Sequence, residues 1–265
     1  MVNISDIVLL TRLRMQLILK QRLGLMSLGV VLFFLIVSYI LSTLTFVNVQ
    51  KMFWDFALGC IFIVIVFLTS YMSTQVFSEE SSNKTLHLVL SSGCSRANWL
   101  LSNILGVFII SALMVIFWTL IAWCFHYALP GSQSGVMIIQ AQILLIFELL
   151  ILSSLGFLLS IYTRSIVAFA SLMVVVVFLH SLDGLEMVFR DHNVGGVVES
   201  HGQYNFLVFW IARLFPPLAW LDVKSFVGYE TQIKWLSVLG LFAVSLGWAM
   251  VIFWASLFKF KKMDL

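Results

Sequence analysis

Charged residues are scarce in this chain of 265 residues. Asp, Glu, Lys and Arg make up 10% of it, whereas hydrophobic residues make up 62%. Soluble globular domains contain about 25% charged residues, so the composition excludes a soluble globule and predicts an integral membrane protein. The alternation of apolar and polar residues that marks a membrane β-barrel is also missing. Apolar helices are therefore the expected spanning elements.

The motifs of several enzyme classes are missing too. The sequence contains no G-x-S-x-G, no H-E-x-x-H and no G-x-x-x-x-G-K-[ST], which mark serine hydrolases, zinc peptidases and phosphate-binding loops respectively. We therefore expect no enzymatic activity from this chain itself. We also expect no nucleic-acid binding, because the net charge of +3 is explained by the basic flanks of membrane segments.

Cysteine is rare, and Cys60, Cys94 and Cys124 fall in three different segments. They form neither a disulfide framework nor a metal motif, so we expect reduced cysteines that pack. Histidines and carboxylates gather towards one predicted membrane face without any fixed metal-ligand spacing. We expect them to be solvated, with a metal site as the alternative. These residues are His126, His180, Asp183, Glu186, Asp191, His192 and His201.

Six apolar segments are long enough to cross a membrane, since a hydrocarbon core of about 30 Å requires about 20 helical residues. The sequence therefore predicts an all-α integral membrane protein with six transmembrane helices in a single domain, residues 1–265. The predicted helices cover residues 24–46, 54–77, 99–126, 136–160, 166–183 and 235–258.

The first segment, residues 1–23, mixes Arg12, Arg14, Lys20 and Arg22 with apolar residues. This pattern is typical of a helix in the membrane interface. A signal peptide is the alternative, but the next segment is long enough to span and lacks a cleavage site. With the N-terminus inside, ten Lys and Arg residues fall on inner segments and five on outer ones. Both termini are therefore predicted to be cytoplasmic.

A polar insert runs from Ser78 to Asn98 between the second and third apolar segments. Because charges in hydrocarbon are costly, this insert must lie in water or against another protein. We expect a short amphipathic helix that Ser78 caps, with Glu79 and Glu80 in its first turn. Gly93 would end that helix.

Three residues of the insert share the apolar face of the predicted short helix, at positions i, i+3 and i+4. They are Leu86, Val89 and Leu90. Ser95 is placed to cap the following helix, which is expected to begin near Trp99. The insert is therefore predicted to be the surface through which a partner outside the bilayer acts on this protein.

Glu148 lies deep inside the fourth predicted span. A carboxylate near the bilayer centre costs about 2.5–3.5 kcal/mol on insertion scales, so it is expected to face the bundle interior or to be protonated. One interpretation is a pathway-lining or proton-sensitive group, with Gln140 two turns earlier as a second pathway candidate. The alternative is a neutral Glu148 that bonds a neighbouring helix.

The run from Thr85 to Arg96, together with Glu80, resembles the loop after the second membrane helix of ABC-2 type transporter permeases. That family's usual form is roughly E-R-x-x-G-T-L-E-x-L-L-x-S-P-x-S-R. Residues Leu158–Ser165 are similar to the family's short second cytosolic turn. The resemblance covers most of the chain in spacing and helix count.

In this family the first loop forms a coupling helix that docks on a separate ATP-binding subunit. The resemblance implies that ATP and Mg bind to that cytosolic partner, that this chain holds no cofactor, and that it exports a substrate across the bacterial inner membrane. The residues expected to couple to the ATPase are Glu79, Glu80, Thr85, Leu86, Val89, Leu90 and Arg96.

The two halves of the sequence show no internal repeat, which favours a pathway between two copies of the chain or with a similar permease. Two other functions stay open. One is a membrane scaffold or assembly factor that recruits a cytosolic partner through residues 78–98. The other is an intramembrane enzyme that uses Glu148.

The extracytoplasmic segment, residues 184–234, starts polar, becomes apolar for about nine residues and then breaks at two prolines. Nine residues are too few to cross a membrane. The family resemblance implies a re-entrant or interfacial helix pair before the sixth span, and a small folded lid is the alternative. The residues assigned to this re-entrant segment are Phe206, Trp210, Arg213, Pro216 and Pro217.

Overall fold

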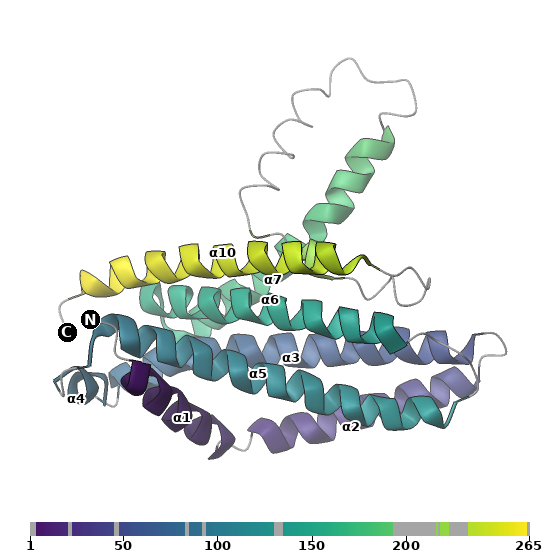
Figure 1. Ribbon diagram of the computed structural model, residues 1–265, viewed down its shortest axis with the longest axis horizontal. Coiled ribbons are helices and arrows are strands. Elements are labelled where there is room, and N and C mark those ends of the chain that lie inside the picture. Colours follow the sequence, from purple (N-terminus) through teal and green to yellow (C-terminus); the bar gives the residue numbers. More distant parts are fainter. Residues whose placement is uncertain are drawn as a thin grey trace.

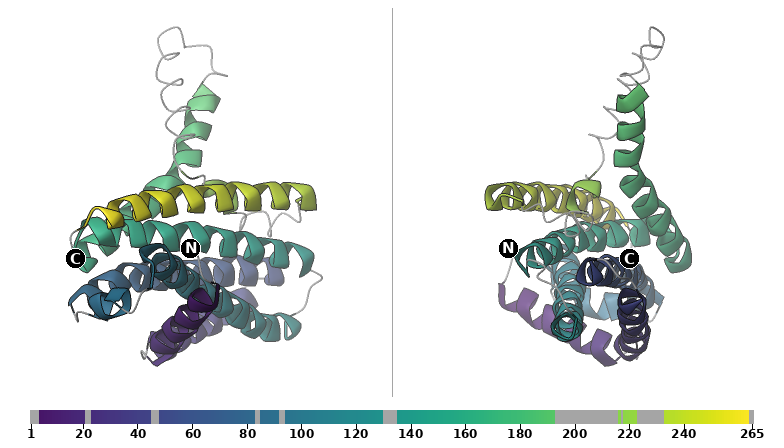
Figure 2. Two further views of the ribbon diagram at one scale, coloured as in Figure 1. Left: turned by 60° about the vertical axis from the view of Figure 1, so that its left-hand side comes forward. Right: turned by 90° about the vertical axis from the view of Figure 1, so that its right-hand side faces the viewer.

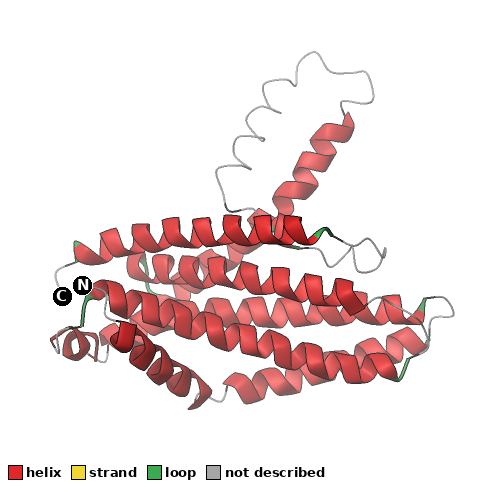
Figure 3. Ribbon diagram, in the orientation of Figure 1, coloured by secondary structure: helices red, strands yellow, loops and turns green. Residues whose placement is uncertain are grey.

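Every long element in the described part of the computed structural model is an α-helix (Figure 3). This confirms the predicted all-α class. The structure describes residues 4–20, 23–44, 48–82, 85–91, 94–129, 135–192, 216, 218–222 and 233–263. Its helices are α1 (Ile4–Lys20), α2 (Leu23–Thr43), α3 (Val49–Ser82), α4 (Thr85–Ser91), α5 (Arg96–Tyr127), α6 (Gly135–Tyr162), α7 (Ser165–His192), the 3-10 helix η2 (Ala219–Leu221) and α10 (Trp235–Lys261).

Five helices are long and apolar enough to cross a membrane, namely α2, α3, α5, α6 and α10. They coincide with five of the six predicted spans. The remaining prediction, residues 166–183, falls on the first part of α7. The apolar part of α7, Ser165–Ser181, has 17 residues and is shorter than the about 20 that a crossing requires. Five such helices are expected of a multi-pass membrane protein.

The long helices run back and forth along one axis (Figures 1 and 2). Helices α2 and α5 run in one direction, and α3, α6 and α10 in the other. Helix α1 begins and α10 ends at the same end of the bundle, beside α4, and we call this the terminal end. Helix α1 crosses the bundle obliquely and packs on α5, where the Thr11 hydroxyl donates to the Ser102 carbonyl over 3.3 Å.

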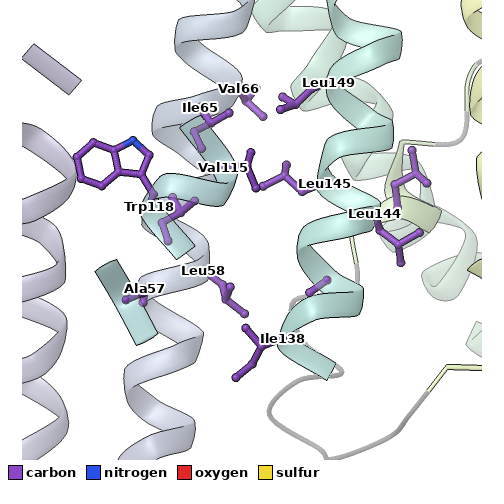
Figure 4. Close-up of a cluster of buried hydrophobic side chains, with 14 of the residues drawn as sticks. Ala57, Leu58, Ile65, Val66, Val115, Trp118, Ile138, Leu144, Leu145 and Leu149 are labelled. Carbon is purple, nitrogen blue, oxygen red and sulfur yellow. The ribbon is translucent and has the colours of Figure 1, made fainter. Parts of the chain in front are cut away.

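The centre of the bundle is a cluster of apolar side chains from α3, α5 and α6 (Figure 4). It includes Ile65 and Val66, Val115, and Leu145 and Leu149, all of them buried. Lipid tails are as apolar as these side chains, so close van der Waals packing and interhelical hydrogen bonds hold such helices together. One such bond joins the buried hydroxyls of Thr69 and Ser111, 2.8 Å apart, between α3 and α5.

Gly156 allows α6 to approach α3 closely. A Cβ atom at this position would collide with the Ser73 side chain and lie 3.3 Å from the Leu172 Cδ2 atom of α7. Small residues at helix contacts are common in membrane bundles, because they let backbones come together.

Replacing Gly156 by alanine is expected to destabilise the protein by about 1–3 kcal/mol, as overpacking of a filled interior does. Gly247 of α10 is the matched control, since a Cβ there meets nothing within 4 Å. Gly247→Ala is expected to be neutral or to stabilise by up to about 1 kcal/mol through helix propensity. Thermal unfolding of the detergent-solubilised variants compares them, and equal midpoints would contradict the close α3–α6 contact.

The predicted extracytoplasmic segment begins differently from expectation. Its first residues, 184–192, continue α7 as a regular helix that leaves the bundle (Figure 2). Pro216 is buried, and its carbonyl accepts a hydrogen bond from the Leu218 amide just before η2. The other residues assigned to the re-entrant segment, Phe206, Trp210, Arg213 and Pro217, lie outside the described residues.

Candidate functional site

The insert begins later than predicted, because α3 continues to Ser82. Ser78 therefore does not cap a new helix, and Glu79 and Glu80 lie in the last turns of α3. The reason is local: the sequence from Phe77 to Ser82 contains neither glycine nor proline, so nothing ends the helix there. Carboxylates near a helix C-terminus face the negative end of its dipole. Glu80 accordingly needs compensating partners.

The Glu80 carboxylate joins three helices. Its Oε1 atom lies 3.3 Å from Arg14 Nη1 of α1, and its Oε2 atom accepts a 2.8 Å hydrogen bond from Trp99 Nε1 of α5. The side chains of Arg14 and Glu80 are only 7% and 17% exposed. Burial lowers the pKa of the Arg14 guanidinium, and the Glu80 carboxylate opposes that shift. Arginine stays charged in proteins, so this contact is an ion pair.

The predicted apolar contact face of the short helix is turned into its own chain. Leu86 of α4 is fully buried, with 0% exposure, and belongs to a cluster that includes Phe77, Trp99 and Phe260. Val89 is half-buried against the same cluster. The Leu90 side chain lies outside the described residues. Leu86, which is expected to contact a partner, therefore packs within its own chain in this structure: an amphipathic pattern shows which face is apolar but not what covers it.

Ser95 caps α5 as predicted, since its hydroxyl accepts from the Asn98 amide over 3.1 Å. Helix α5 begins at Arg96, three residues before the expected start. The Arg96 guanidinium donates to the carbonyls of Phe260, Lys261 and Met263, at 2.7, 3.1 and 3.1 Å. These carbonyls end α10, where cations are favoured. Arg96 therefore fastens the end of α10 to the start of α5.

Together these contacts join α1, α4 and the ends of the long helices α3, α5 and α10 into one unit, which we call the terminal-end cluster. It consists of Arg14, Phe77, Glu80, Leu86, Arg96, Trp99 and Phe260, with the aromatic rings of Phe77, Trp99 and Phe260 5.3–6.1 Å apart.

Two polar residues of α4 are exposed. Thr85 at its start and Ser91 at its end are exposed, and the Thr85 hydroxyl donates to the Glu80 carbonyl over 3.2 Å. Of the seven predicted coupling residues, Thr85 is the one with an exposed side chain in the described part of the chain. A partner at this end would meet Thr85 and Ser91, whereas Leu86 of the same helix belongs to the buried terminal-end cluster.

A second candidate site lies halfway along the bundle. Glu148 is fully buried in α6, and its Oε1 atom lies 3.4 Å from Nε2 of His180 in α7. Beside Glu148 is a cavity of about 10 Å³ that Gln142 and Asp222 also line, which is room for about one water molecule. The prediction that Glu148 faces the bundle interior is confirmed.

Gln140 does not join this site. Its side-chain amide donates to the Ile233 carbonyl over 2.8 Å and accepts from the Ile233 amide over 3.3 Å. Gln140 therefore fixes the chain that enters α10, instead of sharing a polar face with Glu148.

The sequence contained a signal for the Glu148–His180 pair. Helices α6 and α7 are joined by a turn at residues 163–164, so residues equally far from that turn come together. Glu148 lies 14 residues before Tyr162, and His180 lies 15 residues after Ser165. Because His180 was expected to be solvated, its pairing with Glu148 was not predicted.

No group of three or more possible metal ligands occurs among the described residues. His126, expected to be solvated, is buried instead and accepts a 3.0 Å hydrogen bond from Trp54 Nε1. The Asp191, His192 and His201 side chains lie outside the described part, so the alternative of a metal there is untested. A comparison with protein-family models and one with curated proteins found no match to the chain.

Proposed function

We propose that this chain is the membrane subunit of an ABC-2 type exporter, driven by a separate ATP-binding subunit. The observation that carries this proposal is the placement of α4, a short helix that joins two long apolar helices and is held against their ends by buried contacts. A partner that moves α4 moves α3 and α5 with it, because Glu80 and Leu86 connect all three.

The proposed subunit has six spans, with α7 as the fifth. Helix α6 ends at the terminal end, whereas α10 starts at the opposite end (Figure 1), so the intervening chain has to cross the bundle. The first part of α7 takes this course beside α3 and α6. This mainly apolar segment of 17 residues matches a thin or locally compressed bilayer.

The terminal end is proposed to be cytoplasmic, since basic side chains are more numerous there and cytoplasmic flanks carry such an excess. Lys51 and Lys234 lie at the opposite end. The exposed basic residues at or near the terminal end are Arg12, Lys20, Arg164, Lys261 and Lys262.

Two copies of the chain would present two α4 helices, one for each ATP-binding subunit, and would form the export pathway between them in the bacterial inner membrane. Energy would enter through α4, because a partner shifts this protein between states only if it contacts those states differently. ATP and Mg are proposed to bind to the partner subunit.

The surface of α4 is tested by adding a cation to its exposed side. Ser91→Arg is expected to reduce co-purification of a soluble ATPase from the native membrane at least tenfold, because a bulky charge interrupts a fitted interface. Thr163→Arg, exposed at the same end of the bundle but in the turn after α6, is the matched control and should retain the ATPase.

Mass spectrometry of the bound proteins, with thermal unfolding to verify equal folding, gives the result. If both variants retain the ATPase equally, the ATPase does not dock on α4. If wild-type protein instead retains a soluble partner without a phosphate-binding loop, the membrane scaffold replaces the exporter as the proposed function.

A further inference from the structure

The hydrogen bonds of His180 determine which of its ring nitrogens carries a proton. Its Nδ1 atom lies 2.9 Å from the Val176 carbonyl oxygen. A carbonyl oxygen can only accept, so Nδ1 must be the donor. In a neutral imidazole the other nitrogen, Nε2, then carries a lone pair and no proton.

Nε2 is the atom that faces Glu148, at 3.4 Å from Oε1. An ionised carboxylate and an unprotonated Nε2 would place two lone pairs against each other in a buried site, and the contact would be repulsive. One proton, either on Nε2 or on the carboxyl group, makes it attractive. Both placements give the pair a net charge of zero, which is the state that a low-dielectric interior favours.

We propose that Glu148 and His180 form a proton-binding site that holds one proton while α6 and α7 are packed together and releases it when they separate. The bound ligand is a single proton. The adjacent cavity has room for about one water, which gives the proton a carrier at the middle of the bundle.

Separation releases the proton because the two groups behave differently in water. A carboxyl group and an imidazole there have pKa values of about 4.3 and 6.5. At pH 7.5 the separated carboxylate is ionised and the imidazole is about nine-tenths neutral. The separated groups thus hold about 0.1 proton, whereas the packed pair holds one.

The other ionisable groups near the pair do not supply a second proton donor. Asp222, which follows η2, lines the same cavity, and its negative charge favours a proton on the pair. Helix α3 contributes Leu58 and Phe62 to the cavity wall. Helix α10 has no ionisable residue before Lys259. Asp183, one turn after His180, has a side chain outside the described residues.

The sign of the pH effect follows from proton counting. Between about pH 6.5 and the pH at which the packed pair loses its proton, the folded protein binds one proton more than the unfolded chain. Stability therefore falls as pH rises through this range. For one linked proton, the ratio of packed to separated states changes tenfold per pH unit. Below about pH 6.5 the unfolded histidine also binds a proton, and this dependence ends.

The test uses the purified full chain without any ATPase. Unfolding free energy is measured between pH 6.5 and 8.5 for wild type and for Glu148→Gln, whose amide can still donate to Nε2 of neutral His180 but does not titrate. The unfolding equilibrium constant of wild type is expected to change with pH more steeply than that of Glu148→Gln, by about tenfold per pH unit. His126→Gln replaces another buried histidine. Its unfolding free energy is expected to depend on pH as that of wild type does.

A second measurement needs no variant: thermal unfolding of wild type at pH 7.5, in two buffers of different ionisation enthalpy, counts the protons released. The pair contributes about one, and Glu148→Gln removes that contribution. Equal pH dependence of wild type and Glu148→Gln, or equal proton release from the two, would overturn the site.

The proton-binding site does not rest on the proposed function. Failure of the proton measurements leaves docking at α4 untouched. If docking at α4 is disproved, the expected number of released protons is likewise unchanged.

Discussion

Replacing Glu80 by alanine is expected to destabilise the protein by about 3 kcal/mol, the lower range for breaking a buried ion pair. The change leaves the Arg14 guanidinium, 7% exposed, and the Trp99 indole without the oxygens that they contact. Glu79→Ala removes a half-buried carboxylate one residue earlier. It is the matched control and should cost under about 1 kcal/mol. Thermal unfolding in detergent, followed by tryptophan fluorescence, measures both.

A double-mutant cycle identifies the source of the Glu80 effect. If the Arg14–Glu80 contact carries it, Arg14→Met combined with Glu80→Ala will cost less than the two single changes added, by about 1–3 kcal/mol. Strict additivity would show that Glu80 acts through Trp99 or the end of α3 instead.

Replacing Leu86 by aspartate is expected to destabilise the terminal-end cluster by about 4 kcal/mol. The substitution removes a fully buried leucine and places a carboxylate among Phe77, Trp99 and Phe260, which combines a packing loss with the burial of a charge. The same change at exposed Ser91 of α4 should alter stability by under about 0.5 kcal/mol. Unfolding midpoints and protein abundance in the membrane compare the two variants.

The Leu86 result also determines how a docking experiment is interpreted. A partner lost on Leu86→Asp reports a damaged cluster and not a missing contact, so Ser91 is the better position for testing the interface. A Leu86→Asp variant with the wild-type midpoint would show that this side chain is not packed inside and would restore it as a contact residue.

Local sequence signals predicted the parts of the fold that depend on neighbouring residues. Five apolar stretches became five long helices because their length and composition suffice. Ser95 became an N-cap because a serine before a helical run accepts from an amide three residues on. The continuation of α3 through Glu79 and Glu80 could also have been predicted, since residues 77–82 contain neither glycine nor proline.

The contacts of the polar residues could not be predicted from the sequence, because their partners come from distant parts of the chain. Glu80 contacts Arg14, 66 residues earlier, and Arg96 contacts the Phe260 carbonyl, 164 residues later. Both were predicted to face a partner protein, since a charged residue in a polar insert carries no mark of an intramolecular partner. Only the arrangement of α1, α5 and α10 around α4 determines where these charges go.

The length of α3 has a mechanical consequence. Its 34 residues correspond to about 51 Å of continuous helix, some 20 Å more than the hydrocarbon core. Such a helix is a lever arm without a hinge at the membrane surface. Rocking it by about 5° around its midpoint would carry each tip about 2 Å. When the end of α3 at Glu80 moves, the other end, near Gln50, would then move by the same distance in the opposite direction.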